Sequence, residues 1–373
     1  DIPKGYQLSQ YKYPVVSGGA LNGVAITRVH IEEDTATSKH DRGAYTLVDY
    51  NRAGVPLMEL VTEPVMHSAT EAADFAKELQ LLLRTLGVAA ANMEKGELRV
   101  EANISLSDTP EKFGTKVEVK NLNSFRSVER AIEYELARMQ ALYEAGTPEK
   151  IVQETRGWDE HKQLTFSQRS KENANDYRYF PDPDLPKMHL HKAFALEKMK
   201  EEMPELPWQA RERLGKKIEN KELLELFVED SRKRELLDNV VTKYPTLAAS
   251  YIVSSIEADD ITPELYSRIG QAIDMIGDGK ITSTNGKKLL NFVIEEEGDP
   301  ETIAKERGLL QESNEAALRP IISEIISSNE KIVADYKAGK EAALQALVGQ
   351  VIKVTKGNAN PGVVLHLLKE MLG

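Results

Sequence analysis

The sequence contains no cysteine among its 373 residues. This absence excludes disulfide bonds, thiol catalysis and cysteine-ligated zinc within these residues. No run of about 18 apolar residues occurs, so no transmembrane helix is expected. The sequence also lacks a P-loop, a G-x-G-x-x-G loop and a serine–histidine–acid nucleophile motif.

Charge and length place further limits on the chain. The formal net charge is −12 at pH 7, which argues against broad non-specific binding to nucleic acid but not against a local basic patch. Its 373 residues are enough for two or three domains with separate cores. The sequence begins at Asp1 rather than methionine, and no signal-peptide pattern follows. We therefore expect a fragment, and any targeting segment would precede these residues.

The pattern of apolar residues predicts three successive regions. Residues 1–190 alternate between strand and turn patterns and include two long helical patterns. Residues 191–300 are charged, helix-rich and nearly free of strand patterns, and residues 301–373 form a final helical unit. The sequence therefore predicts an α+β fold in which one mixed domain is followed by two helical ones.

Three segments of the first region have especially clear patterns. A helix is expected over residues 68–87, with Ser68 as its N-cap and Glu71 three residues later. A second long helix is expected over residues 125–145. Alternating apolar and polar residues predict a strand over residues 93–106. We assign the first helix to the scaffold.

The segment VEVKNLNSF, residues 117–125, combines a carboxylate with lysines. On a strand, Glu118 shares one face with Lys116 and Lys120. This arrangement suits phosphate chemistry, because the acid can hold a divalent cation and the ammonium groups can neutralise phosphoryl oxygens. The alternative is an exposed strand face with no function, which is common in proteins.

A second acidic residue, Glu101, favours the cation-binding interpretation over an exposed strand face with no function. If the strand over 93–106 pairs antiparallel with residues 115–120, Glu101 and Glu118 meet on one polar face of the sheet. Two neighbouring carboxylates repel each other unless a cation or a proton lies between them. The pair therefore favours a metal site over a solvated face.

Acidic residues also interrupt two stretches nearer the start of the chain. One strand pattern ends on three consecutive acids: Glu32, Glu33 and Asp34. The apolar stretch 47–64 is interrupted by four charged residues: Asp49, Arg52, Glu59 and Glu63. Charges in apolar surroundings are costly unless they are paired or bound to metal. The pattern indicates either a functional site or a pair of strands with ion-paired edges.

A small basic turn separates the last two apolar helices. It contains Lys353, Lys356, Gly357 and Asn358. Basic turns at helix ends suit a sugar-phosphate backbone, and the alternative is an ordinary solvated loop.

Six long runs stand in order along the chain: RVHIEEDT (28–35), LVDYNRAGVPLMELVTEP (47–64), MEKGELRVEANISL (93–106), VEVKNLNSF (117–125), YRYFPDPDLP (177–186) and LVGQVIKVTKGNANP (347–361). Together they resemble the B subunit of the glutamyl/aspartyl-tRNA amidotransferase family. The resemblance covers nearly the whole chain. It implies a cradle domain like the catalytic domain of glutamine synthetase, built on an antiparallel sheet, over residues 1–190. A helical domain over 191–300 and a tail domain like the YqeY family over 301–373 would follow.

The resemblance also implies a reaction and its partners. Members of this family use ATP and magnesium to phosphorylate the side-chain carboxylate of misacylated Glu-tRNA(Gln) or Asp-tRNA(Asn). Ammonia released from glutamine by the partner glutaminase, the A subunit, then displaces phosphate, which gives Gln-tRNA(Gln) or Asn-tRNA(Asn). The small C subunit joins the other two. We therefore expect a cytoplasmic, ATP-dependent carbon–nitrogen ligase component of a heterotrimer with no membrane association, and the absence of cysteine argues against zinc.

Matching positions bring the family's roles onto particular residues of this chain. The implied magnesium ligands or near neighbours are Glu32, Glu33, Glu59, Glu118 and Glu101. The implied catalytic residues are Glu118, Glu59 and Lys120. The implied nucleotide-binding residues are Lys120, Asn121 and Arg52. The implied tRNA-binding residues are Lys353, Lys356, Gly357 and Asn358.

Three features of the sequence bear on these implied roles. The family usually has Asp where Glu101 stands, so the longer side chain would shift a bound ion. Glu32 and Glu33 are adjacent, so a bulge or the strand's end near Asp34 must reorient one of them for both to face the site. The family normally begins with a strand that carries Glu-Val-His metal ligands, often with a cysteine cluster for zinc. Neither precedes Asp1, and we expect that segment to be missing from this sequence rather than from the protein.

Two other functions stay open. One is a self-contained ATP-dependent ligase that acts on a small amino acid, and the other is a catalytically silent scaffold that binds tRNA. The basic turn and the long helical tail favour an RNA substrate over a small amino acid, and only the missing first segment favours the silent scaffold. The choice between Glu-tRNA(Gln) and Asp-tRNA(Asn) stays open as well.

Overall fold

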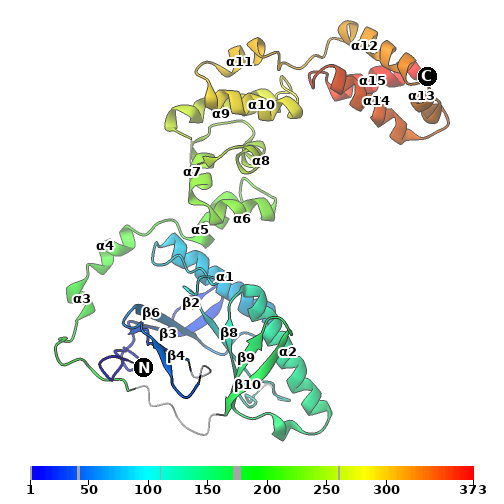
Figure 1. Cartoon of the computed structure of the whole chain (residues 1–373). Coiled ribbons are helices and arrows are strands. Elements are labelled where there is room, and N and C mark those ends of the chain that lie inside the picture. The colour runs from blue at the N-terminus through cyan, green and yellow to red at the C-terminus, as the bar shows by residue number, and fades with distance from the viewer. Residues whose placement is uncertain (1, 40–42, 110, 171–177, 259–260) are drawn as a thin grey trace. The chain divides into compact units, whose positions relative to one another are not determined.

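The computed structural model describes residues 2–39, 43–109, 111–170, 178–258 and 261–373 (Figure 1). The chain divides into two compact units, Asp1–Leu206 and Pro207–Gly373. In the described residues every strand lies in the first unit, whereas the second unit is built from helices. This combination confirms the α+β class that the sequence predicts.

A four-stranded antiparallel sheet forms the first half of the first unit. Its strands are β1 (Val16–Ser17), β2 (Ala20–Leu21), β3 (Val24–Glu33) and β6 (Pro56–Thr62), and β3 pairs with the other three. A separate antiparallel pair consists of β4 (Thr37–Lys39) and β5 (Leu47–Asp49). Helix α1 (Ala69–Thr85) packs Phe75 into an apolar cluster with Val24 and Leu60. One face of β3 and β6 is therefore apolar, and the opposite face is left for polar side chains.

A second four-stranded sheet follows, in the order β10-β9-β8-β7. Its strands are β7 (Val100–Ile104), β8 (Val117–Leu122), β9 (Glu154–Asp159) and β10 (Leu164–Ser170). The β8–β9 pair is parallel, although the sequence led us to expect an antiparallel sheet. The reason is the crossover between these strands, which consists of α2 (Phe125–Glu144) and the 3-10 helix Pro148–Lys150.

The two long helices of this unit begin at serine caps. The Ser68 hydroxyl accepts a hydrogen bond from the Glu71 backbone N–H at the start of α1, as the sequence predicts. The Ser124 hydroxyl caps α2 in the same way. The strand predicted over residues 93–106 is too long, because a turn that ends at Gly96 (φ +70°) occupies its first residues and leaves only β7 as strand.

After β10, the regular elements of the described residues are helices. The first unit ends with α3 (Leu190–Ala193) and α4 (Leu196–Glu201). We call the next seven helices the helical bundle: α5 (Pro207–Leu214), α6 (Lys221–Glu229), α7 (Ser231–Asn239), α8 (Pro245–Ser255), α9 (Pro263–Gly277), α10 (Ser283–Glu295) and α11 (Pro300–Glu306). We call the last four the tail bundle: α12 (Glu315–Ser328), α13 (Glu330–Lys337), α14 (Glu341–Val354) and α15 (Pro361–Leu372).

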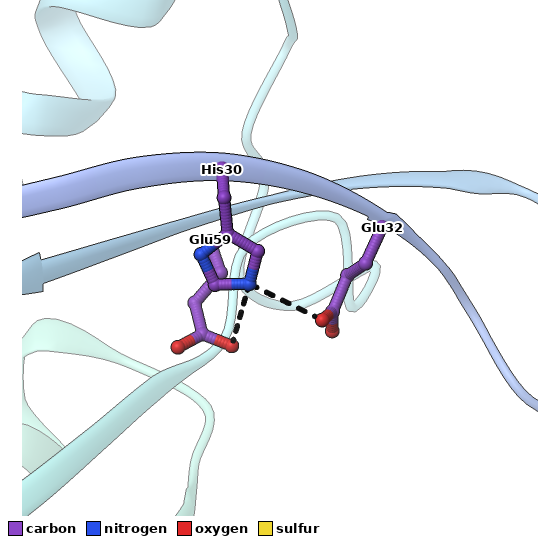
Figure 2. A group of neighbouring side chains, drawn as sticks. All are labelled: His30, Glu32 and Glu59. Atoms are coloured by element: carbon purple, nitrogen blue, oxygen red, sulfur yellow. Dashed lines mark hydrogen bonds and ion pairs between the residues drawn. The ribbon is translucent and has the colours of Figure 1, made fainter. Parts of the chain in front are cut away.

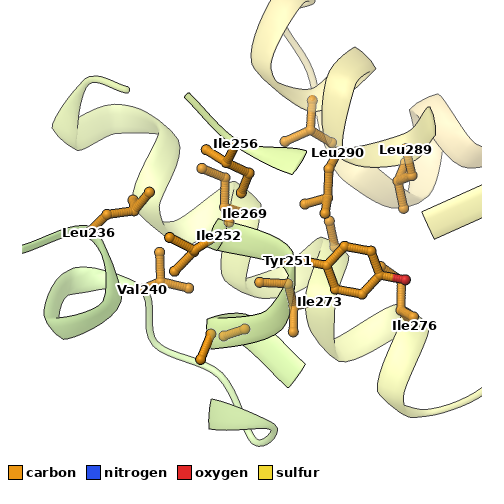
Figure 3. Packing of buried hydrophobic residues seen from close by; sticks show 14 of the residues in the cluster. Leu236, Val240, Tyr251, Ile252, Ile256, Ile269, Ile273, Ile276, Leu289 and Leu290 are labelled. Atoms are coloured by element: carbon orange, nitrogen blue, oxygen red, sulfur yellow. The ribbon is translucent and has the colours of Figure 1, made fainter. Parts of the chain in front are cut away.

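Each bundle has its own apolar cluster. In the helical bundle, the fully buried side chains include Ile252 of α8, Ile273 of α9 and Leu290 of α10 (Figure 3). In the tail bundle, the cluster joins α12, α14 and α15 through Ile322, Leu347 and Leu367. The domain boundaries expected near residues 190 and 300 stay predictions. Among the described residues, no helix is both long and apolar enough to cross a bilayer.

Candidate functional site

Three side chains converge on the polar face of β3 and β6. His30 and Glu59 are cross-strand partners, and Glu32 lies two residues beyond His30 on the same face. The Nε2 atom of His30 lies 3.3 Å from Glu32 Oε2 and 3.8 Å from Glu59 Oε2 (Figure 2). One ligand atom from each residue lies within 4.8 Å of the other two. Among the described residues this is the group of acids and histidines close enough together to hold a metal ion.

The alternation of the two strands explains why these side chains meet. Leu60 of β6 contributes to the apolar cluster beneath α1, so its neighbour Glu59 points to the opposite face. A bulge between Ile26 and Arg28 changes the register of β3, and from Val29 onward the pairing with β6 is regular. Arg28 follows the bulge, and its Nη2 atom lies 3.6 Å from Glu59 Oε1.

Burial makes this group electrostatically unusual. His30 is fully buried, and its Nδ1 atom has no hydrogen-bond partner among the described residues. The ring of Tyr11 lies edge-on to the imidazole, with 6.2 Å between the ring centroids. Burial raises the pKa of Glu32, and repulsion from Glu59 adds to this effect, whereas the hydrogen bond to His30 opposes it. A positive charge between the two carboxylates would relieve this repulsion.

The donor set fits a divalent cation. Two carboxylates are the protein ligands that magnesium usually takes, with the remaining positions left to water or substrate phosphate. The imidazole nitrogen of His30 is a ligand type more usual for transition metals. With its proton on Nε2, His30 instead donates to Glu32 and holds that carboxylate in place.

The structure does not bring Glu33 into this group. β3 runs without a bulge through Glu32 and Glu33, so the reorientation that the sequence required does not occur, and the two side chains take opposite faces. The Glu33 carboxylate binds the Lys4 ammonium and accepts a hydrogen bond from the Leu8 backbone N–H at 2.9 Å. In this structure Glu33 fastens the N-terminal segment to the sheet.

Arg52, expected to contact nucleotide phosphate, instead contacts two residues of neighbouring segments of the chain. Its Nε atom lies 2.9 Å from Asp34 Oδ2, and its Nη1 atom donates to the Gly96 carbonyl at 3.0 Å. The side chain is partly exposed. These contacts connect the ends of β3 and β6 to the turn before β7.

A second charged group lies on β7, β8 and β9. The Lys120 ammonium lies 3.1 Å from Glu101 and 3.8 Å from Glu118, so the two acids meet through the lysine rather than directly. The cross-strand partner of Glu118 is Asn103, and the register of β7 and β8 shifts at a bulge between Val100 and Ala102. The Thr155 hydroxyl donates to the other Glu118 oxygen at 2.8 Å.

Asn121 lies within this bulge. Its backbone has φ +66°, a left-handed conformation that asparagine tolerates better than most residues. Its side chain is exposed near the end of β8, and the chain then turns at the Ser124 cap into α2. The expected metal ligands Glu101 and Glu118 are thus neighbours of Lys120, but they are not members of the His30 group.

The basic turn of the tail bundle divides into exposed and enclosed residues. Lys353 and Lys356 are exposed. Gly357 is buried, and its carbonyl accepts a hydrogen bond from the Thr282 hydroxyl at 2.6 Å. The Asn358 amide bonds to Asn285 at 2.7 Å. Of the four residues expected to contact tRNA, the two lysines are therefore accessible, and the other two are used within the chain.

Comparison with known proteins places these residues in a family. A family profile described as the GatB/GatE catalytic domain matches residues 1–195, and a second described as the GatB domain matches residues 222–372. A protein of Persephonella marina, named as the B subunit of aspartyl/glutamyl-tRNA(Asn/Gln) amidotransferase, is 40% identical over 393 residues, which cover 100% of this chain and 82% of the relative. Proteins with the same name from Thermomicrobium roseum and Alkalilimnicola ehrlichii are 42% and 41% identical, with 81% and 82% of each covered. The chain belongs to the amidotransferase B-subunit family.

Membership of the B-subunit family confirms the resemblance that the six sequence runs indicate. It does not by itself assign any residue. The geometry adds His30, which the sequence interpretation does not single out as a site residue. A signal is present in RVHIEEDT, because a histidine two residues before an acid shares its strand face. What the sequence lacks is the pairing that places Glu59 opposite His30.

Proposed function

We propose that this chain activates and amidates the side-chain carboxylate of an amino acid attached to tRNA. The substrate would be Glu-tRNA(Gln), Asp-tRNA(Asn) or both, in line with the names of the relatives. ATP would phosphorylate the carboxylate, and ammonia from a glutaminase partner would then replace the phosphate. The chain would work in a three-subunit complex with that glutaminase and a small third protein, since its relatives are named as one subunit of an amidotransferase.

The observation that carries this proposal is the convergence of His30, Glu32 and Glu59 on one sheet face. A bound magnesium ion would neutralise phosphoryl oxygens during the transfer from ATP. Glu32 and Glu59 would hold the ion, because an oxygen of each carboxylate lies within 4.8 Å of the other and Glu59 repels the charged form of Glu32. His30 would keep Glu32 in position through the 3.3 Å contact at Nε2.

The second charged group fits a supporting role in the same chemistry. A carboxylate resists attack by ammonia until it carries a good leaving group, and phosphoryl transfer depends mainly on positioning and charge neutralisation. We assign nucleotide phosphates to Lys120, Asn121 and Arg52. The Lys120 ammonium would exchange its contacts with Glu101 and Glu118 for phosphate oxygens, which leaves Glu118 to bind a cation or to orient the lysine.

The tail bundle would hold the RNA. Lys353 and Lys356 are exposed, and lysine ammonium groups bind phosphates as point charges. Gly357 and Asn358 would act indirectly, because they fix the turn that carries both lysines.

An oxygen-transfer experiment tests the reaction class. Glu-tRNA(Gln) or Asp-tRNA(Asn) is prepared with ¹⁸O in the side-chain carboxylate and incubated with ATP, glutamine and the three-subunit complex. The carboxylate oxygen attacks the γ-phosphorus and ADP leaves; ammonia then attacks the carbonyl carbon, and the C–O bond breaks as phosphate departs. One ¹⁸O atom should therefore appear in inorganic phosphate for each amide formed.

Two other outcomes would replace this proposal with its alternatives. Release of ADP with free glutamate or aspartate, without tRNA, would indicate a self-contained amide ligase. Binding of the aminoacyl-tRNA with no ADP release at all would indicate a silent scaffold. Unlabelled phosphate alongside amide product would exclude activation through the carboxylate oxygen.

A further inference from the structure

Hydrogen bonds between three short segments, which also carry the buried Ile281, Leu309 and Ala359, connect the helical bundle to the tail bundle. These are residues 281–285 at the start of α10, residues 308–313 between α11 and α12, and residues 357–360 between α14 and α15. We call these segments the polar joint. The buried apolar clusters of the two bundles share no residue in the described part of the chain. The orientation of one bundle on the other therefore depends on the polar joint.

Thr282 supplies the first contact of the polar joint. It is the N-cap of α10, and its hydroxyl accepts a hydrogen bond from the Asn285 backbone N–H. The same hydroxyl donates its proton to the Gly357 carbonyl at 2.6 Å. One buried side chain thus caps the helix of one bundle and anchors the turn of the other.

Two asparagines supply the second contact. Asn285 is fully buried, and its Nδ2 atom donates to Asn358 Oδ1 at 2.7 Å. The Nδ2 atom of Asn358 in turn donates to the Gly308 carbonyl at 2.8 Å. An amide can make both bonds at once because it carries a donor and an acceptor, which an ionised carboxylate or an apolar side chain does not.

Backbone hydrogen bonds complete the polar joint. The Glu312 N–H donates to the Asn358 carbonyl at 2.7 Å, and the Asn360 N–H donates to the Glu312 carbonyl at 3.0 Å. These bonds form a short parallel bridge between Glu312 and Ala359. The linker between the bundles is therefore fastened directly to the turn before α15.

Gly357 shows how closely the two bundles approach. Its φ of +89° is in the region that favours glycine, and an added Cβ would lie 3.2 Å from Asn285 Oδ1 and 3.3 Å from Thr284 Cγ2. Any other residue would strain the backbone and press against the start of α10.

We propose that the polar joint is a latch, which holds the tail bundle in one orientation on the helical bundle and opens while both bundles stay folded. Opening would exchange hydrogen bonds within the chain for hydrogen bonds to water, and it would cost less free energy than unfolding either apolar core. The latch sets the direction of Lys353 and Lys356, because the Gly357 carbonyl is fixed immediately after them. This consequence for RNA rests on the proposed function, but the latch itself does not.

Spin labels can report the orientation of the two bundles directly. Because the chain has no cysteine, Ser250→Cys on α8 and Ser323→Cys on α12 give two unique, exposed labelling sites. The distance between the labels should have one narrow distribution in the otherwise unchanged chain. The double substitution Thr282→Val with Asn358→Ala should broaden it without loss of helical circular dichroism. Thr282→Ser keeps the hydroxyl, and Asn239→Ala removes an amide bonded within the helical bundle, so both should keep the narrow distribution.

An unchanged distribution in the double variant would overturn the latch. Hydrogen exchange on the unsubstituted chain tests the same point even if the double variant does not fold. The Glu312 and Asn360 amides should exchange through a smaller opening free energy than the Leu289 and Leu367 amides of the two cores. Equal opening free energies would mean that the polar joint opens only when the bundles unfold, which contradicts the proposal.

Whether the polar joint orients Lys353 and Lys356 for tRNA binding can be measured separately in the three-subunit complex. The double variant should raise the KM for aminoacyl-tRNA roughly fivefold or more, with little change in kcat for tRNA-dependent ADP formation. Broadened distances with an unchanged KM would show that the latch does not orient the lysines. If the unsubstituted complex forms no tRNA-dependent ADP, the proposed function fails, and the spin-label distances still decide whether the latch exists.

Discussion

Hydrogen bonds at Glu160 illustrate what one side chain contributes to this fold. The Ser127 hydroxyl and the Trp158 indole N–H both donate to Glu160 Oε2, at 2.7 and 2.6 Å. These bonds, the one from Ser127 first, hold the pKa of Glu160 below its usual value of 4.5. Since the folded state favours the ionised form, this residue stabilises the fold above that pH, and its contribution is lost as pH falls through the folded pKa.

Measurements on Glu160→Gln over a series of pH values test the direction of this pH dependence of stability. The variant should be less stable than the unsubstituted chain at about pH 7, and the difference should shrink as the pH falls below 4.5 and the native carboxylate is protonated. Urea denaturation at each pH, followed by tryptophan fluorescence, measures the free energy of unfolding. Glu149→Gln, at an exposed position, provides the matched control. A stability difference that does not vary with pH would contradict the assignment.

Site residues also differ in how far the sequence predicts them. Glu32 and Glu59 stand out in the sequence because acids interrupt or end apolar stretches there, and the structure brings these two together. Glu33 shares that signal with its neighbour, but the regular register of β3 sends it to the other face. His30 escapes sequence analysis because only the pairing of β3 with β6 reveals Glu59 opposite it.

At the scale of elements, a buried ionic network attaches α2 to the second sheet. Glu135 of α2 is fully buried, and its carboxylate binds Arg138 at 2.7 Å and Arg156 of β9 at 3.0 Å. It also accepts a hydrogen bond from the Thr165 hydroxyl of β10. Arg156 in turn binds Glu154 at 2.6 Å. Every charge of the network has a partner, which buried ions require.

Removal of one partner should therefore lower the free energy of unfolding substantially. Glu135→Ala leaves the Arg156 guanidinium buried without this carboxylate and should lower the free energy of unfolding by about 3–5 kcal/mol. Glu133→Ala changes an exposed acid of the same helix and should stay within about 0.5 kcal/mol of the original. Chemical denaturation of both variants provides the comparison. Equal stability of the two would show that the network contributes nothing beyond a surface charge.

Helices are easier to predict than strands for a physical reason. A helix is specified by local signals, such as the Ser68 and Ser124 caps and the apolar stripes that follow them. A strand needs a partner that can lie anywhere in the chain, and the sequence does not show which one. The parallel pairing of β8 with β9 and the turn at Gly96 therefore lie beyond what the sequence predicts.

At the scale of the whole molecule, the His30 group and the basic turn lie in different units. The His30 group belongs to the unit Asp1–Leu206, and Lys353 and Lys356 belong to the unit Pro207–Gly373. The six sequence runs are sufficient to predict the family, since they extend over both units. They do not predict the polar joint, because Thr282, Asn285 and Asn358 are ordinary polar residues until the fold brings them together.

The proposed function requires Glu32 and Glu59 to hold the cation that helps to activate a carboxylate on tRNA. The most direct test is ADP formation by the three-subunit complex, with ATP and misacylated tRNA, for Glu32→Gln and Glu59→Gln. Glu63→Gln, which changes an acid just after β6 that bonds to Thr27, is the matched control. We predict that both site variants lose at least roughly 100-fold in tRNA-dependent ADP formation, while the control and glutamine hydrolysis by the glutaminase partner persist. ADP formation within about twofold of the original rate in both site variants would contradict the account.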